Sequence, residues 1–201
     1  MIFIQNTRFP NNFSIFTGIA KLSEDLELEQ EDQRMMIFAW WCKAKTMGCF
    51  TKEEFVKGCQ DLIATSIDVL KEALQNAQED LKNNVDDFKG MYEWAYNFTL
   101  EKGQKFLATP MVIALWRMVY FGRDPPIFER WLAYLGEKPP KAISRDTWIL
   151  FGNFVDVIGT DLSVYDGNGE WPTLIYNFVE YEKDRLDANV LATAPEKFRN
   201  K

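Results

Sequence analysis

Apolar residues recur at helical spacing along most of this 201-residue chain, and residues that begin or end helices separate the runs. Clear helix starts are the capping box from Thr51 to Glu54, Ser66, Thr109-Pro110 and Ser144. Their side chains or ring geometry suit a first helical turn, whose backbone N–H groups lack partners within the helix. No run shows the alternation of a half-buried strand. The sequence therefore predicts an all-α fold.

The expected helices form one domain over residues 13–186, between an N-terminal tail 1–12 and a C-terminal tail 187–201. One helix opens at Ser144. The other expected ranges are 13–28, 31–46, 52–62, 67–81, 85–100, 111–121, 127–135 and 173–186. The helix over 31–46 is apolar nearly all round, which indicates a helix that is buried or grips a partner. Successive helix-loop-helix pairs are similar to EF-hands.

Bulk properties exclude several classes of function. A net charge of −7 opposes binding to nucleic-acid phosphates, and uncharged stretches such as 106–116 are too short to cross a membrane. We therefore expect a soluble globular protein that binds neither nucleic acid nor membrane. Three cysteines without a paired spacing fit a reducing compartment, cytoplasmic or nuclear. Zero histidines remove the usual catalytic triads and most zinc sites. We expect no catalytic residue, metal or cofactor.

Two local features could still support other activities. The loop from Asp166 to Glu170 offers oxygen atoms at alternate positions, as in a calcium-binding loop. However, Trp171 stands where that loop requires glycine, and Asn177 where it requires glutamate. Cys49 lies in an expected turn but lacks a neighbour that would clearly activate a thiolate. We prefer a simple turn and a structural thiol.

Two neighbouring segments carry a distinctive residue order, ISRDTW from Ile143 and DLSVYDGNGEWPTLI from Asp161. Upstream lie FAWWCKAKTMGCFTKEEF from Phe38, KGQK from Lys102 and IALW from Ile113. Together these segments resemble the potentiating-neddylation (PONY) domain of the defective-in-cullin-neddylation family. The resemblance implies an EF-hand-like helical domain without calcium ligands.

The resemblance implies an apolar pocket that takes the acetylated N-terminal methionine of the neddylation conjugating enzyme. The matching residues here are Phe16, Ile19, Met35, Phe38, Phe50, Phe98, Leu115 and Met118. Read from the sequence alone, these residues are core. Family members often carry Gln-Cys where this chain has Met47-Gly48, and an aromatic residue is common at the position of Leu115. The pocket should therefore stay apolar but differ in shape and rim.

The resemblance also implies an acidic patch that receives the winged-helix domain of a cullin. The family builds it from an Asp in D-T-W, an Ala before W-P and an Asp after L-I. Here Asp146 matches the first, whereas Glu170 and Tyr176 occupy the other two positions. Without the family, Asp146 is a first-turn carboxylate that satisfies backbone donors. The patch is therefore expected to keep negative charge but to shift it.

On this resemblance the chain is a non-catalytic scaffold, a co-ligase that promotes cullin neddylation within a cullin-RING ligase complex. Its expected partners are a cullin winged-helix domain and the N-acetylated conjugating enzyme. The first alternative is a diverged interaction module with a non-cullin partner, which the changes at Glu170 and Tyr176 would allow. The second is a calcium-binding helical sensor.

Overall fold

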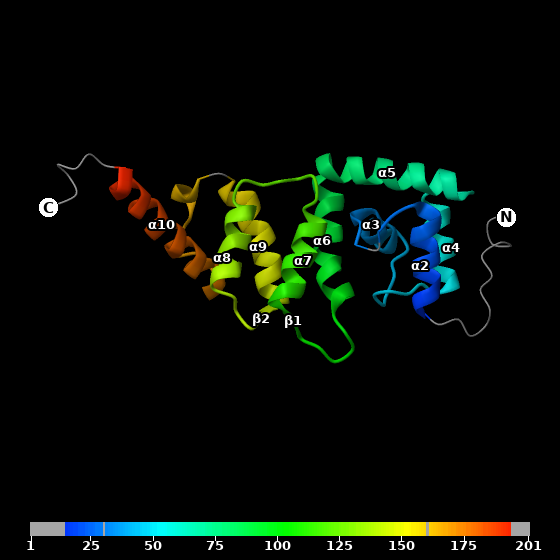
Figure 1. Ribbon diagram of the computed structural model, residues 1–201, viewed down its shortest axis with the longest axis horizontal. Helices are drawn as coiled ribbons and strands as arrows, with labels where there is room; N and C mark the ends of the chain where they lie inside the picture. Colours follow the sequence, from blue (N-terminus) through cyan, green and yellow to red (C-terminus); the bar gives the residue numbers. More distant parts are fainter. Residues whose placement is uncertain (1–14, 30, 160, 194–201) are drawn as a thin grey trace. The chain divides into compact units, whose positions relative to one another are not determined.

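The computed structural model describes residues 15–29, 31–159 and 161–193 (Figure 1). These residues are mostly helical, and the all-α prediction is confirmed. They divide into two compact units. The first comprises the described residues of Met1–Gln104 together with Met111–Arg123. The second comprises those of Lys105–Pro110 and Asp124–Lys201.

The first unit contains α2 (Ile15–Leu26), α3 (Gln33–Trp41), α4 (Lys52–Asp61), α5 (Ile67–Asn83), α6 (Val85–Thr99) and most of α7 (Thr109–Val119). The predicted starts at Thr51 and Ser66 are confirmed. The Thr51 hydroxyl accepts from the Glu54 amide at 3.1 Å, and the Glu54 carboxylate accepts from the Thr51 amide at 2.9 Å. The Ser66 hydroxyl caps α5 in the same way. Helix α5 packs across α2, α3 and α6 (Figure 1).

Helix α3 ends at Trp41, so the predicted end at residue 46 is wrong. The Cys42 amide closes the last turn on the Phe38 carbonyl at 2.9 Å. Lys43 then adopts a φ of 50°, a left-handed conformation that stops an α-helix. The apolar residues before Lys43 continue a helical pattern, so the end of the helix could not be recognised in the sequence. The chain continues as a turn to Phe50, and that turn forms one side of the candidate pocket described below.

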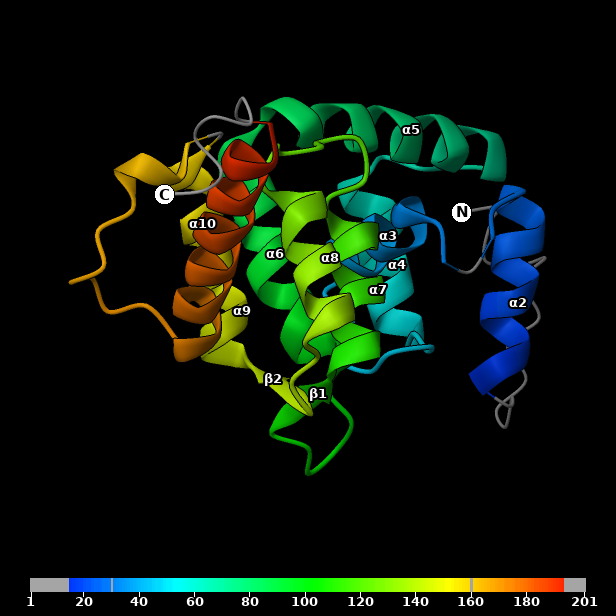
Figure 2. The ribbon, with the colours of Figure 1, turned by 60° about the vertical axis from the view of Figure 1, so that its left-hand side comes forward.

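The second unit contains β1 (Phe106–Ala108), α8 (Phe128–Glu137), β2 (Ala142–Ser144), α9 (Arg145–Ile158), the 3-10 turn η1 (Leu162–Val164) and α10 (Thr173–Thr193). Helix α10 packs against α8 and α9 (Figure 2). The core is aromatic: the Trp131 ring stacks on Phe151 at 4.6 Å and meets Phe178 edge-on at 5.2 Å between centroids. Such pairs add to the stability gained by burial alone.

Two features of the second unit differ from expectation. Strands β1 and β2 pair antiparallel, with buried Leu107 opposite buried Ile143. Three residues a strand are too few for alternation to be recognised in the sequence. Helix α10 continues to Thr193, so its predicted end near residue 186 is wrong. Residues 187–193 include good helix formers and no glycine or proline, which explains the extension.

Each unit also contains buried hydrogen bonds made by polar side chains. In the first, Gln78 donates to Gln33 at 3.0 Å, and Gln33 donates to the Val119 carbonyl at 2.9 Å. In the second, the Glu182 carboxylate, 1% exposed, accepts from Arg130 at 2.5 Å. Such links tie helices together because breaking one leaves a buried polar group unsatisfied. Within the described part of the chain, no helix is long and apolar enough to cross a membrane.

Candidate functional site

The first unit contains an apolar pocket of about 210 Å³ between α2, α3, α6, α7 and the turn after α3. Five of the eight residues expected to line a pocket do so: Ile19, Met35, Phe50, Phe98 and Met118. They come from five separate segments of the chain, so only the folded unit brings them together. The sequence pattern did not assign Glu31, Met36, Ala39 or Cys49 to the pocket, although they line it; Met47 and Gly48 line it as well. Helical spacing from Met35 could have indicated Ala39.

Of the other three expected pocket residues, the two whose side chains the structure describes, Phe38 and Leu115, do not line this cavity. Phe38 is fully buried behind it, where its ring meets Phe50 at 5.4 Å and Phe55 at 5.5 Å. Leu115 is a buried core residue of α7. The side chain of Phe16 lies outside the described residues. Phe38 therefore supports the pocket indirectly by holding Phe50 in place.

The rim of the pocket is mostly uncharged. Glu31 supplies an exposed carboxylate, and Gly48, with a positive φ of 76°, belongs to the turn that lines the pocket. Cys49 is a half-buried free thiol whose Sγ lies 3.7 Å from the Thr46 carbonyl oxygen. Burial raises the pKa of the Cys59 thiol to about 11 and raises that of Cys42 further. These two buried thiols are therefore kept protonated, as suits core residues.

Asp146 stands in the first turn of α9 and is exposed to solvent. The N-cap role belongs to Ser144, whose hydroxyl accepts from the Thr147 amide at 3.1 Å. Asp146 itself has no hydrogen bond or ion pair to a described residue. Its carboxylate thus remains available to a partner, and helix capping does not account for it.

Glu170 and Tyr176 flank the start of α10, Glu170 in the preceding turn and Tyr176 in the first helical turn. Glu170 is exposed, and 47% of Tyr176 is exposed. All three expected patch residues therefore belong to the surface of the second unit. We call Asp146, Glu170 and Tyr176 together the acidic patch.

The turn before Glu170 is held by its own backbone. The Asp166 carboxylate accepts from the Asn168 amide at 2.9 Å, and the Asp166 carbonyl accepts from the Gly169 amide at 3.1 Å. Trp171 anchors the segment by meeting Phe154 edge-on at 5.6 Å. Nowhere in the described ranges do three or more His, Cys, Asp or Glu side chains gather as metal ligands. The loop is therefore an Asx-type turn that presents Glu170.

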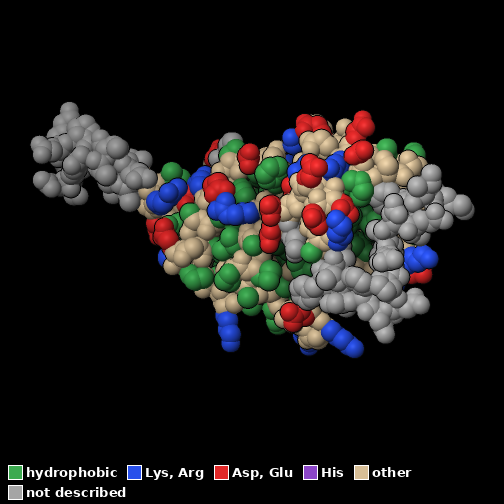
Figure 3. Space-filling view, turned by 45° about the vertical axis from the view of Figure 1, so that its right-hand side comes forward, with side chains coloured by type: hydrophobic (Ala, Val, Ile, Leu, Met, Phe, Trp, Pro, Cys, Tyr) green, Lys and Arg blue, Asp and Glu red, His purple; other side chains and the backbone are tan. Residues whose placement is uncertain are grey.

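Charge on the molecular surface is mixed. The face drawn in Figure 3 carries acidic and basic side chains interspersed, with apolar side chains between them. Salt bridges along helices, such as Lys57–Asp61 at 2.9 Å and Lys183–Glu180 at 3.0 Å, neutralise part of the acidic excess. Side chains without such partners, Asp146 among them, are consequently better placed to meet a charged partner.

Comparison with known proteins identifies the family. The model of the cullin-binding family, described as "Cullin binding", matches residues 69–181. The chain belongs to the cullin-binding family of DCN1-like proteins. It is 38% identical over 188 residues to DCN1-like protein 3 of Rattus norvegicus, covering 89% of this chain and 62% of that protein. For the Homo sapiens protein of that name the identity is 39% over 172 residues, covering 84% and 56%.

A relative of lower identity matches the same share of the chain as the Homo sapiens protein. DCN1-like protein 3 of Drosophila melanogaster is 34% identical over 169 residues, covering 84% of this chain and 50% of the relative. The chain thus spans between 50% and 62% of the length of these three relatives. The cullin-binding family match includes all three residues of the acidic patch and the pocket residues Phe98 and Met118. The pocket residues from α2, α3 and the following turn precede it.

Proposed function

We propose that this DCN1-like chain promotes the neddylation of a cullin by binding two partners at once. The acidic patch would receive the winged-helix domain of the cullin, and the apolar pocket would receive the acetylated N-terminus of the neddylation conjugating enzyme. The assembly would belong to a cullin-RING ligase complex in the cytoplasm or nucleus. Membership of the cullin-binding family supports the first contact, and the pocket geometry supports the second.

The observation that carries the cullin contact is Asp146. It matches the family motif, it is exposed, and it lacks an internal partner among the described residues. A carboxylate in this state gains a charge-assisted hydrogen bond from a basic partner without losing one in the free protein. Electrostatic attraction of this kind mainly sets association rate and specificity, and salt weakens it.

The pocket suits an acetylated methionine for a separate reason. Its walls are Ile19, Met35, Phe50, Phe98 and Met118, which favour an unbranched apolar side chain by burial and packing. A free N-terminus carries an ammonium group that such walls cannot solvate. Acetylation replaces this charge with an amide, whose polar atoms need only one or two hydrogen bonds.

The proposed activity needs no covalent chemistry from this chain. Holding a cullin and a charged conjugating enzyme on one scaffold brings the acceptor lysine near the thioester. It also restricts unproductive orientations, and this proximity contribution can be large. We accordingly propose a non-catalytic activator of a ubiquitin-like protein ligase.

The decisive experiment measures affinity for a cullin winged-helix domain by calorimetry, with Asp146→Arg as the test variant. We expect binding to weaken by roughly tenfold or more, because the reversal replaces attraction with repulsion at a basic surface. Asp184→Arg makes the same charge change at another exposed position of the second unit and should bind almost normally. Equal affinities for native protein and Asp146→Arg would refute the assigned cullin site.

A second candidate function follows from the two changed patch positions. Glu170 adds a charge where the family has alanine, and Tyr176 adds bulk where it has aspartate. These changes also suit an interaction module whose partner is no longer a cullin. Failure of every cullin winged-helix domain to bind the native protein, with the pocket still binding its peptide, would favour this candidate.

A further inference from the structure

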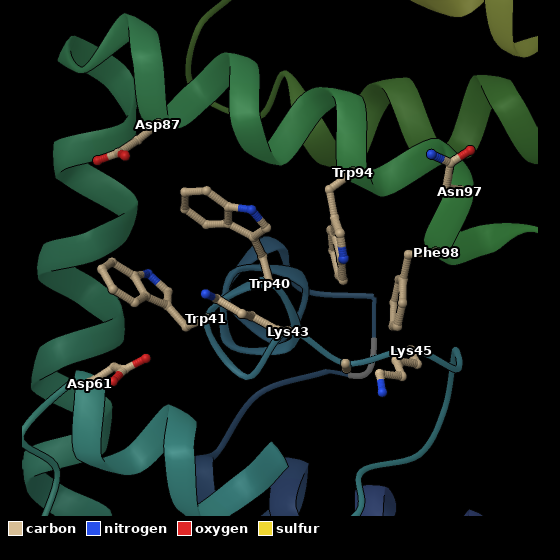
Figure 4. A pocket seen from close by; sticks show the side chains of 10 residues that line it. Trp40, Trp41, Lys43, Lys45, Asp61, Asp87, Trp94, Asn97 and Phe98 are labelled. Atoms are coloured by element: carbon tan, nitrogen blue, oxygen red, sulfur yellow. The ribbon is translucent and has the colours of Figure 1, made fainter.

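A second and larger cavity of the first unit is a cleft of about 730 Å³ at the end of α3 (Figure 4). Its lining includes Trp40, Trp41, Lys43, Lys45, Trp94 and Phe98, and we call it the tryptophan cleft. This volume lies in the range of specific ligand sites. The cleft differs from the apolar pocket in composition, since charged and hydrogen-bonding side chains line it together with the rings.

Three tryptophans are held half-buried around this cleft. Trp40 and Trp41 leave the last turn of α3, with ring centroids 5.8 Å apart. Trp94 on α6 stacks on Phe98 at 4.3 Å. A Cβ at Gly90 of α6 would stand 3.3 Å from the Trp40 ring, so glycine lets that ring lie close to the helix. These contacts restrict the rings of Trp40 and Trp94 before any ligand arrives, which lowers the entropy cost of binding.

The indole groups of the tryptophan cleft also lack polar partners. The N–H groups of Trp40, Trp41 and Trp94 make no hydrogen bond to a described residue, and Figure 4 shows all three rings around the cleft. Tryptophan in this half-exposed state is typical of binding hot spots, where one face gives apolar contact and the N–H selects an acceptor. The site is thus rich in donors.

The charged side chains of the cleft also favour a ligand with acceptor groups. Asp61 is paired with Lys57 at 2.9 Å, whereas Asp87 accepts only from the neutral side-chain amide of Asn84 at 2.7 Å, so the two lysines of the lining outnumber its one carboxylate without a cation partner among the described residues. Lys43 and Lys45 are exposed and have no ion pair to any described residue. In a chain of net charge −7, two unpaired lysines beside three tryptophans are distinctive. The chemistry that complements ammonium and indole N–H groups is a carboxylate or a peptide carbonyl.

We propose that the tryptophan cleft is a second peptide-binding site, which takes an acidic segment of a partner protein. An apolar side chain of that segment would lie among Trp40, Trp41 and Trp94, and neighbouring carboxylates would meet Lys43 and Lys45. This inference is independent of the proposed function, because these residues do not line the apolar pocket. Phe98 is the shared residue of the two linings.

The test is fluorescence polarisation of the whole chain with fluorescein-labelled twelve-residue peptides. One peptide carries a central Leu-Phe flanked by Asp and Glu; a second replaces the acidic residues by Gln, and a third replaces Leu-Phe by Ser-Ser. We expect the first peptide to bind at least about tenfold tighter than the other two, with affinity falling as salt rises. Equal affinity for the Gln peptide, or no binding of the first peptide, would overturn the proposal.

Variants locate the binding on the protein. Lys43→Glu with Lys45→Glu should weaken the acidic peptide by at least about tenfold, because it reverses both charges of the cleft. Lys52→Glu with Lys102→Glu is the matched control, a double reversal at two exposed lysines outside the lining. Trp41→Ala should weaken binding similarly, and circular dichroism checks its fold. The lysine variants are exposed changes, so they decide the question even if Trp41→Ala unfolds.

A trimethyllysine peptide separates this proposal from a cation-binding aromatic cage, which tryptophan rings can also form. We expect it not to bind. Tighter binding of that peptide, strengthened by the two lysine reversals, would assign the cleft to cations and overturn the proposal. Binding of an acetylated conjugating-enzyme peptide should be the same in both lysine variants, so failure at one site is distinguishable from failure at the other.

Discussion

The apolar pocket and the acidic patch use opposite physical designs. The pocket is assembled from side chains that the first unit also needs for its own packing, such as Met35 at 7% exposure and Phe98 at 8%. The patch consists of exposed residues of the second unit, and Asp146 bonds to no described neighbour. One site is thus continuous with a hydrophobic core, and the other is placed on a surface.

Because of this difference, substitutions in the two sites should affect folding stability and binding in different proportions. On the proposed function, a change in the pocket should alter folding stability and binding together, because surrounding side chains lose packing as well as ligand contact. A change in the patch should alter binding with little cost in stability, since isolated surface substitutions are usually within about 0.5 kcal/mol. Measuring stability beside affinity therefore tests whether each site is built as described.

The largest expected effect is on the aromatic support of the pocket. Phe38→Ala should lower the free energy of unfolding by about 3–5 kcal/mol, because it empties a fully buried site that packs against Phe50 and Phe55. Urea denaturation measures the change. Tyr176→Ala, made as the patch counterpart, should cost about 1 kcal/mol or less. Comparable losses in the two variants would abolish the distinction between core and surface sites.

The next effect concerns the charge of the ligand in the pocket. The N-terminal peptide of the neddylation conjugating enzyme should bind roughly tenfold to a thousandfold tighter when acetylated, since burying an ammonium group costs on the order of several kcal/mol. Isothermal titration of both forms gives the ratio. Asp146→Arg, a patch variant, should leave this ratio unchanged. If the native protein binds both forms equally, the apolar residues are only core.

A smaller effect is expected when the family pattern of the patch is restored. Glu170→Ala combined with Tyr176→Asp should bind the cullin of the same organism more weakly, by about threefold to tenfold, if the native residues match that surface. Surface plasmon resonance at two salt concentrations can measure it. Tighter binding by the double variant would instead indicate that the native patch has lost affinity. The free energy of unfolding of the double variant should equal that of the native protein.

The smallest expected effect is the loss of stability when the N-cap of α9 is removed, which tests whether capping and cullin binding are separate at this helix. Ser144→Ala removes the hydroxyl that accepts from the Thr147 amide and should cost about 1 kcal/mol of stability. Cullin affinity should change less than in Asp146→Arg, because the carboxylate remains on the helix. Thermal unfolding and calorimetry together provide both values. A larger loss of affinity in Ser144→Ala would mean that the patch depends on an exact helix start.

The sequence predicted most of the helices because their starts are chemically explicit. The capping residues at Thr51, Ser66 and Ser144 stand where the structure places them. Helix ends were harder. The break at Lys43 depends on one left-handed residue within an apolar run, and the extension of α10 lacks a stop signal before Pro195.

The candidate sites were predictable to different degrees. Motif order predicted the patch residues, and their role stays a prediction; the helix start at Ser144 was also predicted, but the sequence could not show that Asp146 makes no bond to a described neighbour. For the pocket, residue type could not distinguish a lining residue from one behind it, as Phe50 and Phe38 illustrate. The tryptophan cleft could not be predicted from the sequence beyond the apolar character of α3. Lys43 and Lys45 follow α3 whereas Trp94 lies on α6, and only the folded unit brings them into one lining.

Phe98 lines both the apolar pocket and the tryptophan cleft, with its ring stacked on Trp94. An allele that removes this ring would therefore be pleiotropic, and no phenotype caused by it could be ascribed to either cavity. Separation-of-function alleles must come from residues that belong to a single lining. Met118 offers such a position for the pocket and Lys43 for the cleft, so a cross between the two would reveal whether the cavities serve one pathway or two.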